Sequence, residues 1–186
     1  MLAARTAWAI LESEHAHMRR LLASMAVILS ASDGNWCRPG ASQTRLRRLI
    51  DTLQAFDRAS HRPKGVAMLQ AMSGRSAPAD CQLAKLSLER ARSDAELLDA
   101  KASLDAIGEG HEAACSDCRA LLVSYHDGLL RQMEEEETLL RGYAEQLLTE
   151  EEWSRVVSDI STLHSRQGRA GQAAGSSGRR QSRHQV

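Results

Sequence analysis

The sequence predicts an all-α protein, an up-down-up-down four-helix bundle with a short fifth helix at its C-terminal end. Aromatic residues make up only 3% of the 186 residues while alanine and leucine abound, and this composition favours helices over a β-sandwich. Apolar residues recur at three- and four-residue spacing along four long segments. Short segments rich in Gly, Pro and Ser separate them, so we expect consecutive helices to be antiparallel.

The first helix is predicted over residues 2–29. Its apolar face contains a histidine, His15, whereas His17 lies about 200° away around the helix and is expected to face solvent. A loop over residues 30–42 follows. The residues of this apolar face are Trp8, Leu11, His15, Met18, Leu22, Met25 and Leu29.

The second helix is predicted over residues 43–72. Pro63 lies inside this pattern and should kink the helix near residues 59–61, because proline cannot donate a backbone hydrogen bond. Its apolar face contains a second histidine. The residues of this face are Leu46, Ile50, Leu53, Asp57, His61, Met68 and Met72.

The third helix is predicted over residues 81–107, after a loop over residues 73–80. Gly108 and Gly110 are expected to end it. The pattern predicts one inward face for this helix, and that face contains an arginine. The residues of this predicted face are Leu88, Arg92, Ala95, Leu98 and Ala102.

The fourth helix is predicted over residues 111–148, and a carboxylate lies in the middle of its apolar face. Glu136 there must be paired, protonated or bound to a metal, because burying a lone charge is too costly. Its neighbours Glu134 and Glu135 point elsewhere and are expected to be solvated. The residues of the face are Cys118, Tyr125, Leu129, Gln132, Met133, Glu136, Leu140, Tyr143 and Leu147.

The C-terminal part combines a helix start with a polar tail. Thr149 and Glu152 form a capping box that opens a fifth helix over residues 150–163. Residues 165–186 are rich in Arg, Gly and Ser without apolar periodicity, which predicts a disordered tail after a bundle domain at 1–164. Since the tail lacks interleaved aromatics, we interpret it as solvated rather than as a nucleic-acid surface.

All four long helices are expected to direct a polar side chain into one layer of the core. At 1.5 Å per residue, the predicted heights of these side chains fall close together. A polar layer from several helices is typical of a metal site in a helical bundle. The side chains concerned are His15, His61, Arg92, Gln132 and Glu136.

Residues 14–22, 60–64 and 132–140 together resemble the hemerythrin-like (HHE cation-binding) family, and residues 148–153 resemble the run after its last helix. The resemblance covers about residues 8–160. The family carries His on helix 1, His-x-x-x-Glu on helix 2, His on helix 3, and His-x-x-x-Glu or His-x-x-x-Asp on helix 4. These side chains hold two irons bridged by the carboxylates.

By this resemblance three metal ligands remain, namely His15, His61 and Glu136. The other three ligand positions are altered, and they are occupied by Gly65, Arg92 and Gln132. The surviving set would serve one of the two metals, so the resemblance implies at most one iron per chain, or none. Two histidines and one carboxylate also form the facial arrangement that holds mononuclear Fe(II) with open positions.

The leading interpretation is a hemerythrin-like cation-binding protein that binds or senses iron, dioxygen or nitric oxide, rather than an enzyme. A first alternative is a metal-free interaction module, in which Arg92 forms an ion pair with Glu136. A second is a mononuclear non-heme iron enzyme, which would need a cosubstrate pocket beside His61. The sequence identifies no protein partner, and it contains no nucleophile elbow, phosphate loop or dinucleotide fingerprint.

The cysteines suggest a compartment and a smaller candidate site. Cys115 and Cys118 form a Cys-x-x-Cys motif with His111 and His126 on the same face, a set that suggests zinc. Because Cys115 and His126 are more than about 15 Å apart on a helix, one ion cannot bind all four. We therefore predict buried thiols, with a redox role for the pair left open, and an exposed Cys37.

Four cysteines without the density of a disulfide framework indicate a reducing cytoplasm. No apolar run approaches 18 residues, so no membrane span is expected.

Overall fold

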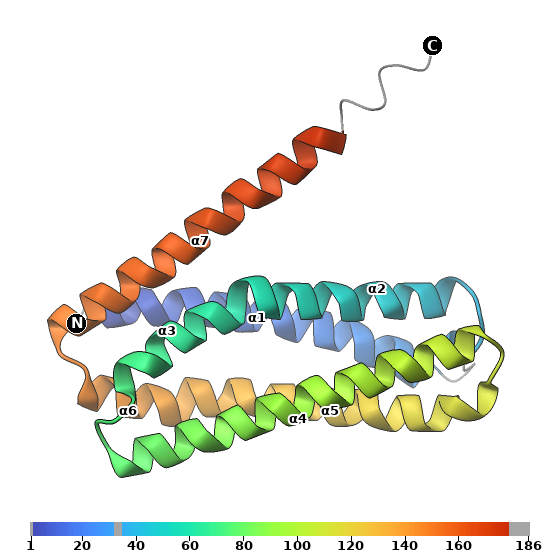
Figure 1. Ribbon diagram of the computed structural model, residues 1–186, viewed down its shortest axis with the longest axis horizontal. Helices are drawn as coiled ribbons and strands as arrows, with labels where there is room; N and C mark the ends of the chain where they lie inside the picture. The colour runs from blue at the N-terminus through green and yellow to red at the C-terminus, as the bar shows by residue number, and fades with distance from the viewer. Residues whose placement is uncertain (1, 32–34, 179–186) are drawn as a thin grey trace.

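The computed structural model describes residues 2–31 and 35–178, and all regular structure in these ranges is helical. This confirms the predicted all-α class. Four helical rods lie side by side, and the chain reverses direction from each rod to the next (Figure 1). We call these four rods the bundle. They are α1 (Leu2–Ser30), α2 with α3 (Ala41–Phe56 and Arg62–Met72), α4 (Ala77–Gly108), and α5 with α6 (Cys115–Glu135 and Arg141–Leu147).

The first rod, α1, matches its predicted bounds and its predicted buried face. All seven residues of that face are buried, and His15 has no exposed surface. His17 is half-buried, since its ring packs against Phe56 with the ring centroids 4.5 Å apart. A short 3₁₀ turn, η1 (Asn35–Cys37), precedes α2.

The second rod bends where the proline predicts. A π-helical segment, η2 (Asp57–His61), separates α2 from α3, and Pro63 lies in the first turn of α3. Proline has no backbone N–H, so the hydrogen-bond ladder must change its register before this point. The altered register places His61 at the end of the π-helical segment, facing the core.

The predicted inward face of α4 is wrong. Leu88 and Leu98 are 73% and 68% exposed, and Arg92 also lies on the outside. α4 carries apolar residues on two faces, so its periodicity could not indicate which face is buried. It also begins earlier than predicted, with Pro78 in its first turn. The residues actually buried are Ala79, Leu86, Ser93, Leu97, Ala100, Leu104 and Ile107.

The fourth rod is less continuous than predicted. It begins with a 3₁₀ turn, η3 (Glu112–Ala114), and a π-helical segment, η4 (Glu136–Leu140), separates α5 from α6. A π-helical turn holds more residues than an α-helical one, so the buried face rotates after Leu140. The core is therefore filled by Ala144 and Leu148, while the predicted Tyr143 and Leu147 are half-buried.

The last helix, α7 (Glu150–Gly178), begins with the predicted capping box. The backbone N–H of Thr149 donates to Glu152 at 2.9 Å, and that of Glu152 donates to Thr149 Oγ1 at 3.4 Å. α7 packs across α1 and α3, oblique to the bundle (Figure 1). Its helical backbone continues past the predicted end at residue 163, and residues 179–186 of the predicted tail lie outside the described residues.

Two apolar clusters fill the molecule, and a polar layer lies between them. One cluster joins α1, α2, α4 and α5 toward the end that holds η1. The other joins the start of α1 to α3, α6 and α7. The buried polar side chains between the two clusters include Glu14, His15, Ser60, His61, Lys64, Gln132 and Glu136.

A disulfide joins Cys37 in η1 to Cys115 at the start of α5, with a Cα–Cα distance of 5.6 Å, which lies within the normal range. The predictions of a buried thiol at Cys115 and an exposed Cys37 were wrong, because the bond joins cysteines 78 residues apart and leaves Cys37 half-buried. Cys118 is a buried thiol, as predicted, and Cys81 is an exposed one. Among the described helices, none is long and apolar enough to cross a membrane.

Candidate metal centre

Three side chains from three rods meet in the polar layer. The Nε2 atoms of His15 and His61 are 2.9 Å apart, and Glu136 Oε2 lies 3.4 Å from the first and 3.6 Å from the second. All three side chains are almost completely buried. His61 ends one π-helical segment and Glu136 begins the other. Departures of this kind from α-helical geometry occur frequently at functional sites.

The other ring nitrogen of His15 faces a carboxylate. His15 Nδ1 lies 2.7 Å from Glu137 Oε1. Arg19 holds that carboxylate with two hydrogen bonds of 2.8 and 2.7 Å. The contact with Glu137 fixes the orientation of the His15 ring and leaves Nε2 directed at the centre. Metal-binding histidines are commonly held in this way, by a carboxylate at the ring nitrogen that does not bind the metal.

His61 has the same kind of support. Its Nδ1 lies 3.1 Å from Asp57 Oδ1, one helical turn earlier. Arg62 donates to Asp57 at 2.6 and 3.0 Å and to Asp94 on α4 at 2.8 and 2.9 Å. The network therefore anchors the π-helical segment to α4 as well as orienting the imidazole.

These contacts determine the protonation of the two imidazoles without a metal. Each Nδ1 must carry a hydrogen to donate to its carboxylate, and the contact between the Nε2 atoms needs one more. The pair of rings then holds three protons and one positive charge. Burial is the largest influence and lowers the pKa of His61, but hydrogen bonds with Asp57 and Glu136 outweigh it and raise that pKa to about 9.

Glu136 is ionised between the imidazole pair and the guanidinium of Arg90. Burial raises the pKa of Glu136, but its contacts with His15 and His61 and the charge of Arg90 together hold that pKa well below its usual range. Arg90 Nη2 donates to Glu136 Oε1 at 2.6 Å, so Oε2 alone faces the imidazoles.

Arg90, not Arg92, is the arginine that enters the layer. Arg92 lies outside and forms an ion pair with Glu96 at 2.9 Å. A Cβ added at Gly65 would lie 3.4 Å from Arg90 Nη2, so the absence of a side chain there leaves room for the guanidinium. The sequence analysis placed Arg92 in the layer instead of Arg90, two positions earlier, because it assigned the wrong face of α4 to the core.

Gln132 is buried beside the centre as predicted, but it bonds to a residue that the sequence analysis missed. Its Nε2 donates to Ser93 Oγ at 3.3 Å. A cavity of only about 10 Å³ lies between these two side chains and His61, with Arg62 and Tyr125 also in its wall. That volume holds about one water molecule, so no organic cosubstrate fits beside His61.

The three converging donor atoms fit a transition metal. Metal–nitrogen and metal–oxygen bonds of about 2.0–2.2 Å place neighbouring donor atoms roughly 2.9–3.6 Å apart. The separations of 2.9, 3.4 and 3.6 Å lie in this range. Within the described part of the chain, His15, His61 and Glu136 form the only group of three or more potential ligands that converge in this way.

A buried ion pair beside the centre was also missed. Lys64 is completely buried and forms a short ion pair with Glu14, and Ser60 donates to the same carboxylate oxygen at 2.5 Å. Glu14 and Ser60 directly precede His15 and His61 in the sequence. The pair therefore joins α1 to α3 at the level of the two imidazoles. The one feature of the sequence that could have indicated this ion pair is that Lys64 lies one helical turn after Ser60.

The suggested zinc set does not form. Cys115 is in the disulfide, and His111 is exposed with its Nδ1 3.2 Å from the carbonyl oxygen of Ala106. His126 contacts the neighbouring Asp127 at 2.8 Å. Burial raises the pKa of the Cys118 thiol to about 11, so it stays protonated and is a poor metal ligand near neutral pH.

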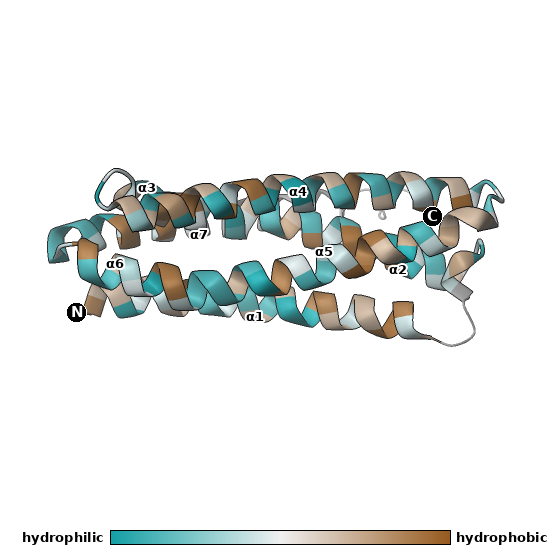
Figure 2. Ribbon diagram, turned by 90° about the horizontal axis from the view of Figure 1, so that it is seen from below, coloured by the Kyte–Doolittle hydropathy of each residue, from teal (hydrophilic) through white to brown (hydrophobic). Residues whose placement is uncertain are grey.

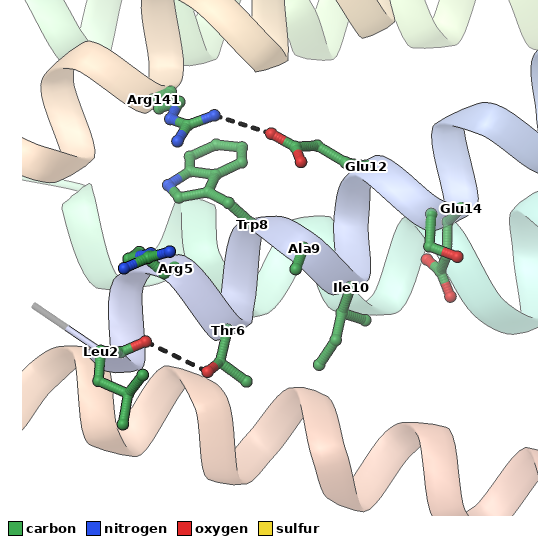
Figure 3. Close-up of a pocket in the computed structure, with 10 residues that line it drawn as sticks. Leu2, Arg5, Thr6, Trp8, Ala9, Ile10, Glu12, Glu14 and Arg141 are labelled. Atoms are coloured by element: carbon green, nitrogen blue, oxygen red, sulfur yellow. Dashed lines mark hydrogen bonds and ion pairs between the residues drawn. The ribbon is translucent and has the colours of Figure 1, made fainter.

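A pocket of about 710 Å³ lies elsewhere. It is an open groove along the first turns of α1, where Arg141 of α6 bonds to Glu12 at 2.8 Å and stacks 5.6 Å from the Trp8 ring centroid (Figure 3). None of its walls comes from His15, His61 or Glu136. The pocket therefore does not reach the three converging donor atoms, although Glu14 of the polar layer lines it.

No protein-family model, curated protein or solved structure matches this chain.

Proposed function

We propose that this chain is a hemerythrin-like protein that binds one divalent transition-metal ion, iron in the first instance, through His15, His61 and Glu136. The observation that carries the proposal is the convergence of two Nε2 atoms and one carboxylate oxygen at separations of 2.9–3.6 Å. The carboxylates at both Nδ1 atoms support it, because such partners orient metal-binding imidazoles and raise their basicity.

A stoichiometry of one follows from what replaces the other ligands. Gln132 and Ser93 bond to each other on the side where the resemblance places the second metal. Arg90 fills the space beside Gly65 and neutralises the second oxygen of Glu136. A second dication would therefore meet a fixed positive charge and no imidazole, which is unfavourable in a poorly screened interior.

We propose binding or sensing rather than catalysis on an organic molecule, because the cavity beside His61 holds no more than about one water. A bound iron would supply coordination positions that the protein leaves open, which suits a diatomic ligand such as dioxygen or nitric oxide. Glu137 and Asp57 would hold the imidazoles in place during binding.

A metal-free interaction module is the second candidate. It is favoured by one observation, that His15 and His61 contact each other at 2.9 Å and Arg90 donates to Glu136, so each of the three side chains has a partner without a metal. In that case the layer is a buried ionic network that fixes how the rods pack, and the function lies on the outer surface of the bundle.

Metal content separates the two candidates. We expect tag-free protein from iron-replete cells to contain up to one iron per chain, and metal-free protein to bind one Co²⁺ per chain in calorimetry. The variant His61→Ala should abolish this binding, whereas His126→Ala, a matched change at an outer histidine, should not. Absence of binding by the unmodified protein, or equal binding by the His61→Ala variant, would refute the proposed metal site.

A further inference from the structure

The outer surface of α4 carries an apolar stripe that the fold of a single chain does not use. Its residues follow one another at alternating spacings of three and four. All seven are exposed, and the two leucines are 73% and 68% exposed. We call this set the α4 stripe. It consists of Cys81, Ala84, Leu88, Ala91, Ala95, Leu98 and Ala102.

This spacing is the a and d pattern of a coiled coil, sustained over three heptads. Cys81, Leu88, Ala95 and Ala102 occupy a positions, and Ala84, Ala91 and Leu98 occupy d positions. The inward face of α4 is a separate set that packs against the other rods. α4 lies along one edge of the bundle (Figure 2), so its outer face is accessible to another molecule.

We propose that the α4 stripe is the interface of a two-fold symmetric dimer, in which the α4 helices of two copies pack antiparallel. In an antiparallel pair, a positions lie opposite d positions. The stripe then complements itself, with Leu88 opposite Leu98 of the partner subunit and Ala95 opposite Ala91 of the partner subunit. Alanine at four of the seven positions lets the helix axes approach to about 8 Å.

Charges beside the stripe favour the antiparallel direction. Position e faces position e of the other copy, so Lys85, which also pairs with Glu135 of its own chain at 2.7 Å, lies opposite Asp99 of the partner subunit. A parallel pair would instead bring Asp94 against Asp99 of the partner subunit. Near the two-fold axis, Arg92 and Asp94 meet their own copies, but Glu96 and Arg62 already neutralise them within each chain.

The contact is long enough for a stable dimer. Residues 81–102 span about 32 Å of helix, at 1.5 Å per residue. Burying the seven residues of the α4 stripe and the side chains that flank them, over this length, would remove on the order of 1,200 Å² of accessible surface in total from the two copies, the lower limit of standard interfaces. The leucines in the middle of the strip would be the apolar anchors.

Sedimentation of the full chain over a wide concentration range tests the dimer. We expect reversible dimerisation, and we expect Leu88→Glu to raise the dimer dissociation constant at least tenfold, because two carboxylates would enter the apolar seam. Val27→Glu is the matched control, since Val27 is 70% exposed on α1, and it should leave dimerisation unchanged. Circular dichroism would show that both variants stay helical. A monomer at every concentration, or equal effects of the two changes, would overturn the proposal.

Disulfide cross-linking tests the direction. In a Cys81→Ser background, the paired changes Leu88→Cys and Leu98→Cys should give covalent dimers on mild oxidation, whereas Leu88→Cys alone should not. Cys81 of the unmodified chain lies far from its own copy in an antiparallel pair, so it should not cross-link. Rapid dimer formation through Cys81, or through Leu88→Cys alone, would show a parallel pair and overturn the antiparallel arrangement.

Discussion

Raising the pH of the metal-free protein through 9 should deprotonate His61 and destabilise the fold. The pKa of His61 rises from 6.5 to about 9 in the folded state. One unit corresponds to about 1.4 kcal/mol, so the linkage amounts to about 3 kcal/mol. Because the folded pKa is the higher one, this stabilisation is complete below pH 6.5 and is lost as the pH rises through about 9.

Urea denaturation of metal-free protein at a series of pH values measures this change. The free energy of unfolding should fall between pH 6.5 and about 9, with an unchanged denaturant slope. Glu136→Gln is the control, because it removes one of the charges that raise the pKa of His61, so its pH dependence should be smaller. A free energy that stays flat across this window would refute the raised pKa of His61 and the tautomers assigned here.

Three further outcomes are expected. Arg90→Met should raise the affinity for Co²⁺ by about tenfold, because Glu136 loses a competing cation in the same layer, as calorimetry would measure. Lys64→Met should cost about 3–5 kcal/mol in urea denaturation, because it leaves Glu14 charged and buried without its partner. Reducing the Cys37–Cys115 bond should lower the free energy of unfolding by about 4 kcal/mol, since it closes a long loop in the unfolded chain.

Each of these has a control within the chain. Arg92→Met removes an arginine on the outer face of α4 and should leave Co²⁺ affinity unchanged. Adding Glu14→Leu to Lys64→Met should recover most of the lost stability, because no lone buried charge then remains. Cys118→Ser should not change the effect of the reductant. Equal effects of Arg90→Met and Arg92→Met would contradict the assignment of Arg90 to the polar layer.

Local patterns in the sequence predicted several features of this structure. All seven residues predicted on the inner face of α1 are buried, because its apolar residues form one unambiguous stripe, but the buried Glu14 was not among them. Pro63 indicated the irregular segment before α3, and Thr149 with Glu152 indicated the start of α7, because both act within one helical turn. These features depend on backbone hydrogen bonding among near neighbours.

The candidate centre was only partly accessible in the same way. His15, His61 and Glu136 were predicted to share one layer, and the structure brings them together. The arginine beside them was assigned wrongly, because α4 has apolar residues on both faces and periodicity cannot tell which face another helix covers. The bond between Ser93 and Gln132 and the ion pair between Lys64 and Glu14 were missed for a related reason. The spacing of residues within one helix does not indicate which residue on another rod will be their partner.

The sequence by itself determined that the chain is helical, where α1 and α7 begin, where the second rod bends, and most of the buried apolar face of α1. Only the tertiary structure decided which face of α4 turns inward, which arginine reaches Glu136, and that Cys37 lies beside Cys115. Helix formation and capping depend on residues within a few positions of each other. Pairing between rods depends on side chains up to more than one hundred positions apart, as between His15 and Glu137, which meet only when all the rods pack together.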